Sequence, residues 1–147
     1  MKMSALLSRN ASSRPGITGT ARVDRDIDKL LRRLSPGDIA VMDAQDLDRV
    51  TADALVEANV AAVVNASSSI TGRYPNLGPE VLVANGITLV DETGDDVFKK
   101  IKDGARIRIN EGGLYSGDRR LALGTERTDA DIHELMQEAK GGLVAHL

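Results

Sequence analysis

Apolar residues along this chain fall into two patterns, short continuous runs and helical stripes. Continuous runs bounded by glycine or polar residues are typical of buried strands, and they occupy residues 38–43, 60–65 and 87–92. Between them, apolar residues recur three and four positions apart, which predicts amphipathic helices. These helices are expected over residues 24–34, 46–59, 77–85 and 94–104. Asp24 is the expected N-cap of the first helix.

Shorter patterns flank this central part. Residues 17–23 alternate between apolar and small or polar side chains, which predicts an edge strand. Residues 105–110 also alternate between apolar and polar side chains, so one face of that strand should be exposed to solvent. The pattern of residues 114–124 predicts a hairpin. The final helix should begin at a capping box of Thr128 and Asp131. Its apolar stripe consists of Ile132, Leu135, Met136, Ala139 and Leu143.

Strands that alternate with helices predict a parallel sheet and an α/β fold. The expected organisation is a flexible N-terminal arm over residues 1–16, one domain over 17–128 and a C-terminal helix over 129–147. Because the stripe of the last helix is still open at the final residue, we expect the chain to be part of a longer protein.

Composition narrows the function classes. The chain has no cysteine, which excludes disulfides, thiol catalysis and cysteine-bound metals. The net charge is −3, and acidic and basic residues are interspersed along the chain without a basic patch, so no nucleic-acid partner is expected. No apolar run approaches the length of a membrane span. A cytoplasmic location is therefore the expectation.

The loop after the second continuous run is the main candidate site. Its small residues let backbone N–H groups converge, and the next helix start and Arg73 add positive charge, which suits a phosphate or carboxylate. Tyr74 could stack on a base or pack on Pro75. The alternatives are a loop that only shapes a connection and a protein contact. The candidate ligand-binding residues are Asn65, Ser67, Ser68, Ser69, Thr71, Gly72, Arg73, Tyr74 and Asn76.

Two groups of acidic residues admit two readings each, a Mg²⁺ site or helix capping. One group is Asp91, Glu92, Asp95 and Asp96, and the other is Asp43, Asp46 and Asp48. Capping is the favoured reading, so no metal and no cofactor are expected. His133, in the final helix, is expected to be a solvated residue without metal-ligating partners.

The order and spacing of several segments resemble the swivelling phosphohistidine domain of phosphoenolpyruvate-utilising enzymes. The segments are "GDIAVMD", "VAAVVNA", "SITG", "VANGITLVDETGDDVFKKIKDGARIRIN" and "GGLYSGD", which together span residues 37–118. The resemblance implies a β/β/α architecture. Aligning "SITG" puts Arg73 at the position of the family's histidine, whereas aligning Gly86 and Ile87 puts Leu77 there. Neither residue can carry a phosphoryl group as histidine does, so phosphohistidine chemistry is expected to be absent.

A closer resemblance covers nearly the whole chain after residue 13. The segments "RPGITG" and "GRYPNLGPE" are similar to the N-terminal part of the SteA family, cytokinetic ring proteins of mycolic-acid bacteria. The resemblance implies a role in cell division and cell separation, and a SteB-like membrane protein as partner. It also implies a thiamine pyrophosphokinase-like domain beyond residue 147, whose activity stays open.

The SteA-like resemblance implies a non-enzymatic domain that acts through partner binding and self-association, with a homodimer as one form. It would be recruited from the cytoplasm to the division site at the membrane. No activating base is expected near the loop serines, which argues against their phosphorylation. The alternative is a sensor that binds a nucleotide or another phosphate-containing small molecule in the loop of residues 65–78.

Overall fold

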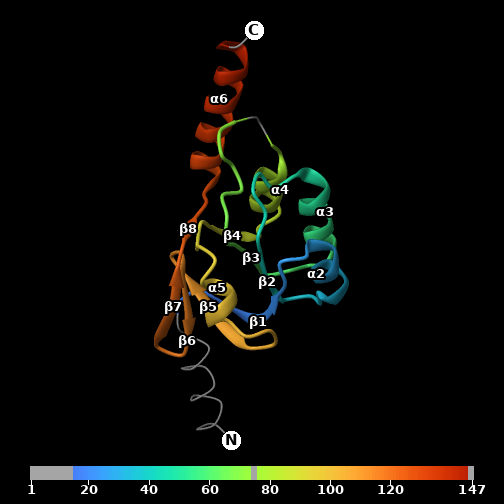
Figure 1. Ribbon diagram of the computed structural model, residues 1–147, viewed down its shortest axis with the longest axis vertical. Coiled ribbons are helices and arrows are strands. Elements are labelled where there is room, and N and C mark those ends of the chain that lie inside the picture. Colours follow the sequence, from blue (N-terminus) through green and yellow to red (C-terminus); the bar gives the residue numbers. More distant parts are fainter. Residues whose placement is uncertain (1–14, 74–75, 146–147) are drawn as a thin grey trace, which may run out of the picture.

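The computed structural model describes residues 15–73 and 76–145, and the side chains up to residue 141. The described part is a mixed α/β fold with one eight-stranded sheet and five helices (Figure 1). The strands are β1 (Ile17–Val23), β2 (Ile39–Met42), β3 (Ala62–Asn65), β4 (Thr88–Asp91), β5 (Arg106–Asn110), β6 (Gly113–Ser116), β7 (Arg119–Leu123) and β8 (Thr125–Glu126). The helices are α2 (Ile27–Arg33), α3 (Arg49–Glu57), α4 (Gly78–Ala84), α5 (Val97–Lys100) and α6 (Asp129–Ala145). Most of the expected N-terminal arm, Tyr74 and His146 lie outside the described residues.

The sheet has the order β7-β6-β5-β1-β2-β3-β4-β8. Strands β1 to β4 are parallel to one another, as the alternation of strands and helices predicts. The remaining pairs are antiparallel. Because β2, β3 and β4 are parallel, their carboxyl ends meet at one edge of the sheet, where α/β folds commonly place ligands.

The first strand is internal, so the prediction of an edge strand over residues 17–23 is wrong. Ala21 pairs with Ile39 of β2 on one side, and Thr18 pairs with Arg108 of β5 on the other. A Cβ on Gly19 would lie 2.6 Å from the carbonyl oxygen of Gly37. The small residues of this strand therefore allow close approach of the backbone, which the same alternating pattern cannot distinguish from an edge.

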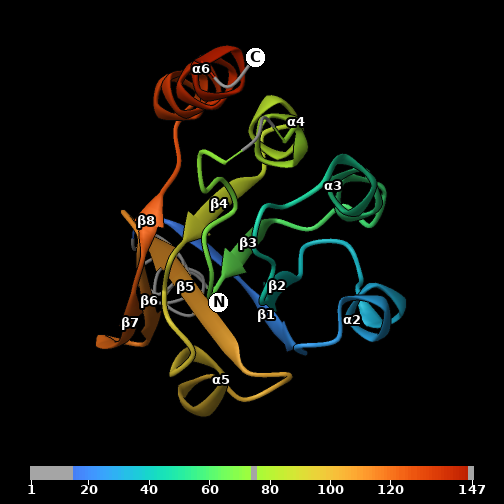
Figure 2. The same ribbon diagram turned by 45° about the horizontal axis from the view of Figure 1, so that its top comes forward.

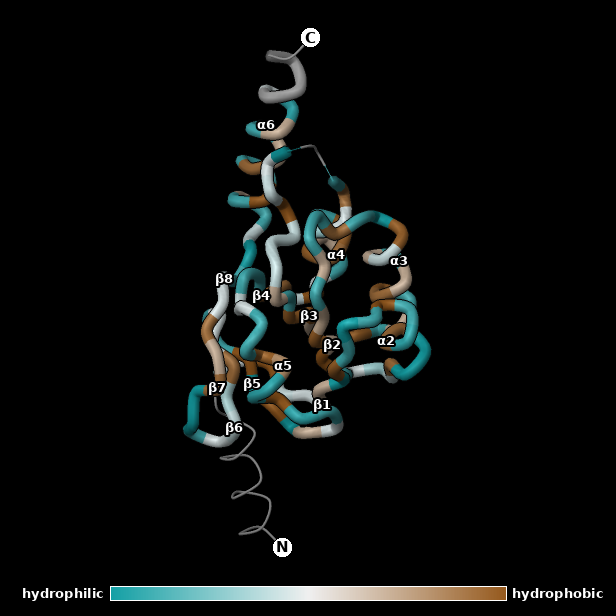
Figure 3. The backbone as a smooth tube through the Cα atoms, viewed as in Figure 1, coloured by the Kyte–Doolittle hydropathy of each residue, from teal (hydrophilic) through white to brown (hydrophobic). Residues whose placement is uncertain are grey.

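Alternate residues of the central strands point to opposite faces of the sheet and pack into two separate apolar cores. In β2, Ile39 and Val41 face a core shared with β5, β6 and α5, whereas Ala40 and Met42 face α2, α3 and α4. The hydropathy-coloured tube shows apolar residues concentrated along these central strands (Figure 3). The three helices cover one face of the sheet, and α5 lies on the opposite side (Figure 2).

Gly124 joins the two ends of the sheet. It lies between β7, which pairs with β6, and β8, which pairs antiparallel with β4. A Cβ there would lie 2.5 Å from the carbonyl oxygen of Asp91. The sheet therefore curls until its two ends come together, a feature that the hairpin prediction for residues 114–124 did not include.

The helix ends differ from the prediction in two places. Asp26 caps α2 and accepts a hydrogen bond from the backbone N–H of Lys29 at 3.2 Å, so Asp24 is not the N-cap. Instead, Asp24 accepts from the backbone N–H of Asp26. Helix α5 is a single turn instead of a helix over 94–104, because Gly94 and Gly104 have positive φ angles and residues 101–105 turn towards β5.

The capping box of α6 is confirmed. Asp131 accepts from the backbone N–H of Thr128 at 2.7 Å, and Thr128 accepts from the backbone N–H of Asp131 at 3.2 Å. The first half of α6 packs on the body through Ile132 and Met136, which contact Ile70. Its second half extends beyond the sheet (Figure 1). Within the described residues, none of the helices is long and apolar enough to cross a membrane.

Candidate functional site

The candidate loop crosses the edge where β2, β3 and β4 end. Its backbone is bonded to both neighbouring connections. Ser68 and Ser69 accept from the backbone N–H groups of Asp46 and Leu47 at 2.9 and 3.0 Å, and Ser67 accepts from that of Glu92 at 3.1 Å. The loop is therefore fixed between the β2–α3 and β4–α5 connections.

Asn65, at the end of β3, is fully buried and uses both ends of its amide. Its Oδ1 accepts from the backbone N–H groups of Ala44 at 2.8 Å and Ser67 at 3.2 Å. Its Nδ2 donates to the carbonyl oxygen of Ala44 and to Ser69 Oγ, both at 2.7 Å. The predicted ligand-orienting amide is thus occupied by the protein itself.

Ser69 continues this network to Asp91, at the end of β4. Its Oγ and backbone N–H donate to the Asp91 carboxylate at 2.6 and 2.9 Å. Arg127, which follows β8, donates from Nε to the same carboxylate at 3.1 Å. Asp91 is fully buried and Arg127 is only 11% exposed in its side chain. The network therefore links the loop to the start of α6.

Burial raises the pKa of Asp91 above its ordinary value of 3.8, although the bonds from Ser69 and the charge of Arg127 lower it in part. A folded-state pKa above the unfolded value means that the folded protein binds more protons in the interval between them. Stability should therefore fall as pH rises through that interval. Urea unfolding over this pH range should give a flatter stability profile for Asp91→Asn than for the natural sequence. Equal slopes in the two proteins would contradict this assignment.

Two further acids bond loop hydroxyls. Asp46, whose φ is +55°, accepts from the backbone N–H and the hydroxyl of Thr71, both at 2.9 Å. Asp43 accepts from the Ser67 hydroxyl. A carboxylate that could act as a base therefore lies beside the hydroxyls of both Ser67 and Ser69, contrary to the expectation that no activating base is near the loop serines. Sequence reasoning missed the Asp43 contact because Asp43 follows a different strand.

The remaining predicted residues lie further along the loop. Ser68 Oγ donates to the carbonyl oxygen of Ile70 at 2.8 Å. Asn76 is buried and its Nδ2 donates to the carbonyl oxygens of Leu47 and Ser69, both at 2.7 Å. Arg73 is exposed, and the half-buried Gly72 before it has a φ of +85°. The prediction that these residues bind a ligand stays a prediction, now centred on Arg73.

The acidic groups have mixed roles. Asp48 caps α3 through the backbone N–H of Thr51 at 2.7 Å, and Asp96 occupies the N-cap position of α5. Asp95 and Asp43 pair with Arg25, which lies over the Phe98 ring. Among the residues described, no group of three or more histidine, cysteine or acidic side chains is arranged to hold a metal ion.

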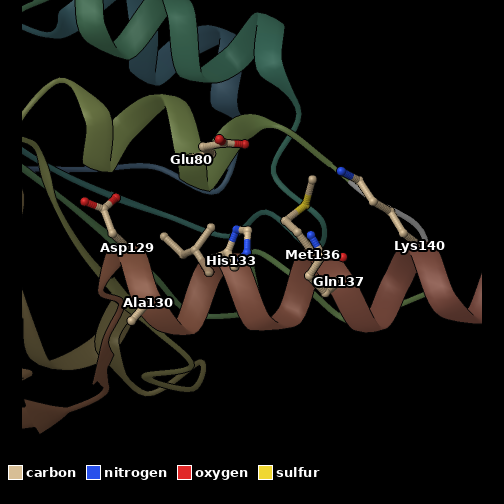
Figure 4. A pocket seen from close by; sticks show the side chains of 8 residues that line it. Glu80, Asp129, Ala130, His133, Met136, Gln137 and Lys140 are labelled. Carbon is tan, nitrogen blue, oxygen red and sulfur yellow. The ribbon is translucent and has the colours of Figure 1, made fainter.

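A groove with a volume of about 670 Å³ lies between α4 and α6. Glu80 of α4 lies across it from His133 and Met136 of α6 (Figure 4). Ile132 and Met136 are buried at its base, whereas His133 is exposed. The lining residues are Glu80, Asp129, Ala130, Ile132, His133, Met136, Gln137 and Lys140.

Sequence reasoning missed this groove, although two signals indicated its parts. The apolar stripe of α6 marked an apolar face of that helix, and the expected solvation of His133 agrees with its exposure. The sequence does not show which element packs on that face, because α4 and α6 are far apart in the chain and come together where β8 pairs with β4.

Comparisons with known proteins identify no family for this chain. No protein-family model matches the chain, and no curated protein matches it. Among solved structures, the chain is similar to an uncharacterized protein from Pseudomonas syringae pv. tomato str. DC3000, with 9% sequence identity and a TM-score of 0.37. The match covers 86% of this chain and 65% of that one, so this chain spans less than two thirds of that protein's length.

Proposed function

We propose that this chain is the non-enzymatic N-terminal domain of a SteA-like cytoplasmic protein that acts in cell division and daughter-cell separation. It acts through partner binding and self-association, and it is recruited to the division site at the membrane. The segments "RPGITG" and "GRYPNLGPE" support the family part of the proposal. The mixed α/β fold with its C-terminal helix is compatible with a swivelling, phosphohistidine-like domain.

The groove between α4 and α6 carries the binding part of the proposal. It combines a buried apolar base with exposed charged side chains on both walls, which is the arrangement of grooves that accept an amphipathic helix. The loop of residues 65–78 lies beside the groove. Its polar side chains form hydrogen bonds within the protein, as described for Asn65, Ser69 and Thr71.

Charge indicates which partner fits the groove. The groove is lined by two carboxylates, Asp129 of α6 and Glu80 of the facing wall, and by one lysine, and α6 carries three further acidic residues outside the lining. A complementary segment would therefore carry basic residues beside an apolar face. Cytoplasmic segments next to a membrane span are rich in Lys and Arg, so we assign the groove to such a segment of the SteB-like partner. Self-association should use another surface, because two acidic α6 helices repel.

Charge reversal in the groove should weaken this complex. Glu80→Lys places a cation where the basic partner segment binds, and His133→Trp fills the groove from the α6 side. Each change is expected to raise the Kd for the partner peptide by about tenfold or more. Isothermal titration calorimetry of the whole chain with the partner's juxtamembrane peptide would measure it. The matched control is Glu134→Lys, the same change at an exposed α6 position outside the groove lining.

Unchanged affinity in Glu80→Lys and His133→Trp would contradict the assignment of the groove, as would an equal loss in Glu134→Lys. A thermal-shift titration with nucleotides and phosphate tests the alternative function, a sensor that binds a phosphate-containing ligand in the loop of residues 65–78. Stabilisation that disappears in Arg73→Ala would favour a sensor in the loop over a partner-binding domain.

A further inference from the structure

Five exposed cations gather on the opposite side of the sheet from the α4–α6 groove, where α5 packs against β7. Two come from α5 and two from the start of β7, and one follows α5 in the turn to β5. Because these segments are far apart in sequence, the pattern along the chain does not show the cluster. The cations are Lys99, Lys100, Lys102, Arg119 and Arg120.

Two adjoining hollows lie between these segments. The larger one, of about 320 Å³, is lined by the cations of α5 and β7 together with Leu121. The smaller one, of about 240 Å³, adds Lys102 and Ser116 above an apolar base that contains Ile101 and Ile107. Lys100, Arg119 and Leu121 line both hollows, so the two form one continuous depression with a cationic part and a partly apolar part.

The segment that contains these cations is positively charged, whereas the rest of the chain is negatively charged. Residues 99–120 contain seven Lys or Arg residues and three acids, a net charge of +4 in a chain of net charge −3. Two acids close in sequence to these cations pair with other arginines, Asp103 with Arg33 at 2.9 Å and Asp95 with Arg25 at 3.6 Å. Like charges are thus held together at the depression, which an anion of more than one charge would relieve.

We propose that this depression binds a phosphate-bearing ligand, with its phosphate groups between Lys100 and Arg119 and its less polar part over Leu121 and Ile107. Guanidinium groups bind phosphate oxygens in pairs, and lysine adds a mobile point charge. The size of the hollows matches a small ligand or a headgroup. An extended polyanion such as a nucleic acid does not fit, because the remainder of the chain is strongly negative and repels it.

The test uses the whole chain and two probes that share this chemistry. Pyrophosphate represents a free phosphate ligand, and vesicles of phosphatidylglycerol in phosphatidylcholine present a phosphate headgroup. The variant is Lys100→Gln/Arg119→Gln, two exposed positions on the depression. The control is Lys29→Gln/Arg32→Gln, which removes the same charge from exposed positions of α2. Calorimetry measures pyrophosphate binding, and co-sedimentation measures vesicle binding, both at low and high salt.

Binding of either probe should weaken at least tenfold in Lys100→Gln/Arg119→Gln and stay within twofold in Lys29→Gln/Arg32→Gln. Binding of pyrophosphate identifies a free ligand as the source, and binding of vesicles alone identifies a lipid headgroup. Equal losses in both variants would show a general charge effect and overturn the proposal. So would the absence of binding of both probes to the natural sequence. The result is independent of the groove, because Glu80 and His133 are unchanged.

Discussion

Replacing Asn65 with leucine is expected to lower the free energy of unfolding by about 3 to 5 kcal/mol. Leucine has a similar volume but no polar atoms. It leaves the N–H and C=O of Ala44 without their side-chain partner in a buried site, and it removes one of the two bonds of the Ser69 hydroxyl, which keeps its bond to Asp91. Each buried polar group that loses its partner costs about 1 to 3 kcal/mol. Urea unfolding followed by circular dichroism measures the change.

The matched control is Asn85→Leu. Asn85 is exposed at the end of α4, and its Nδ2 makes one hydrogen bond, to the carbonyl oxygen of Val81. This substitution should cost no more than about 1 kcal/mol. If Asn65→Leu were as mild as Asn85→Leu, Asn65 would be free to orient a ligand, and the structural account of the loop would be wrong.

Replacing Gly78 with alanine is expected to destabilise the fold by about 3 kcal/mol, the upper part of the range for overpacking. A Cβ on Gly78 would lie 2.2 Å from the carbonyl oxygen of Leu47 and 2.7 Å from that of Asp48. These are backbone atoms at the start of α3, so they cannot move aside as a side chain can. Relief requires α4 to shift away from α3, which disturbs the packing of Leu82 against Leu55.

The matched control is Gly141→Ala, the same substitution at a position where no loss of stability is expected. Gly141 lies in the exposed part of α6, and a Cβ there meets no atom within 4 Å. Alanine should therefore leave stability unchanged or raise it by up to about 1 kcal/mol through helix propensity. Thermal unfolding of both variants measures the difference. Equal stability of Gly78→Ala and the natural sequence would refute the close α3–α4 contact.

Much of the fold could be predicted from the sequence because local patterns determine it. The continuous runs at β2, β3 and β4 and the stripes at α2, α3 and α6 depend on nearby residues alone. The capping box of Thr128 and Asp131 is equally local. By contrast, the internal position of β1 depends on its pairing with β5, which lies far along the chain.

The sequence predicts the loop of residues 65–78 as a candidate site but does not predict its hydrogen-bond network. The small polar residues set the loop of residues 65–78 apart from the predicted strands and helices. Their bonding partners could not be predicted, because Asp46 and Asp91 reach the loop from the β2–α3 connection and from the end of β4, and Arg127 joins the network through Asp91. The same limit applies to the α4–α6 groove and to the cations at α5 and β7. Each of these features is produced by tertiary packing between distant segments.

The α4–α6 groove is proposed to bind a basic, amphipathic segment of a membrane-bound partner. A titration of the isotope-labelled whole chain with the partner's juxtamembrane peptide, followed by backbone amide NMR, tests it most directly. The predicted result is that shifts concentrate on Glu80, His133 and Gln137, which line the groove. Shifts confined to the loop around Arg73, or no shifts at saturating peptide, would contradict the account.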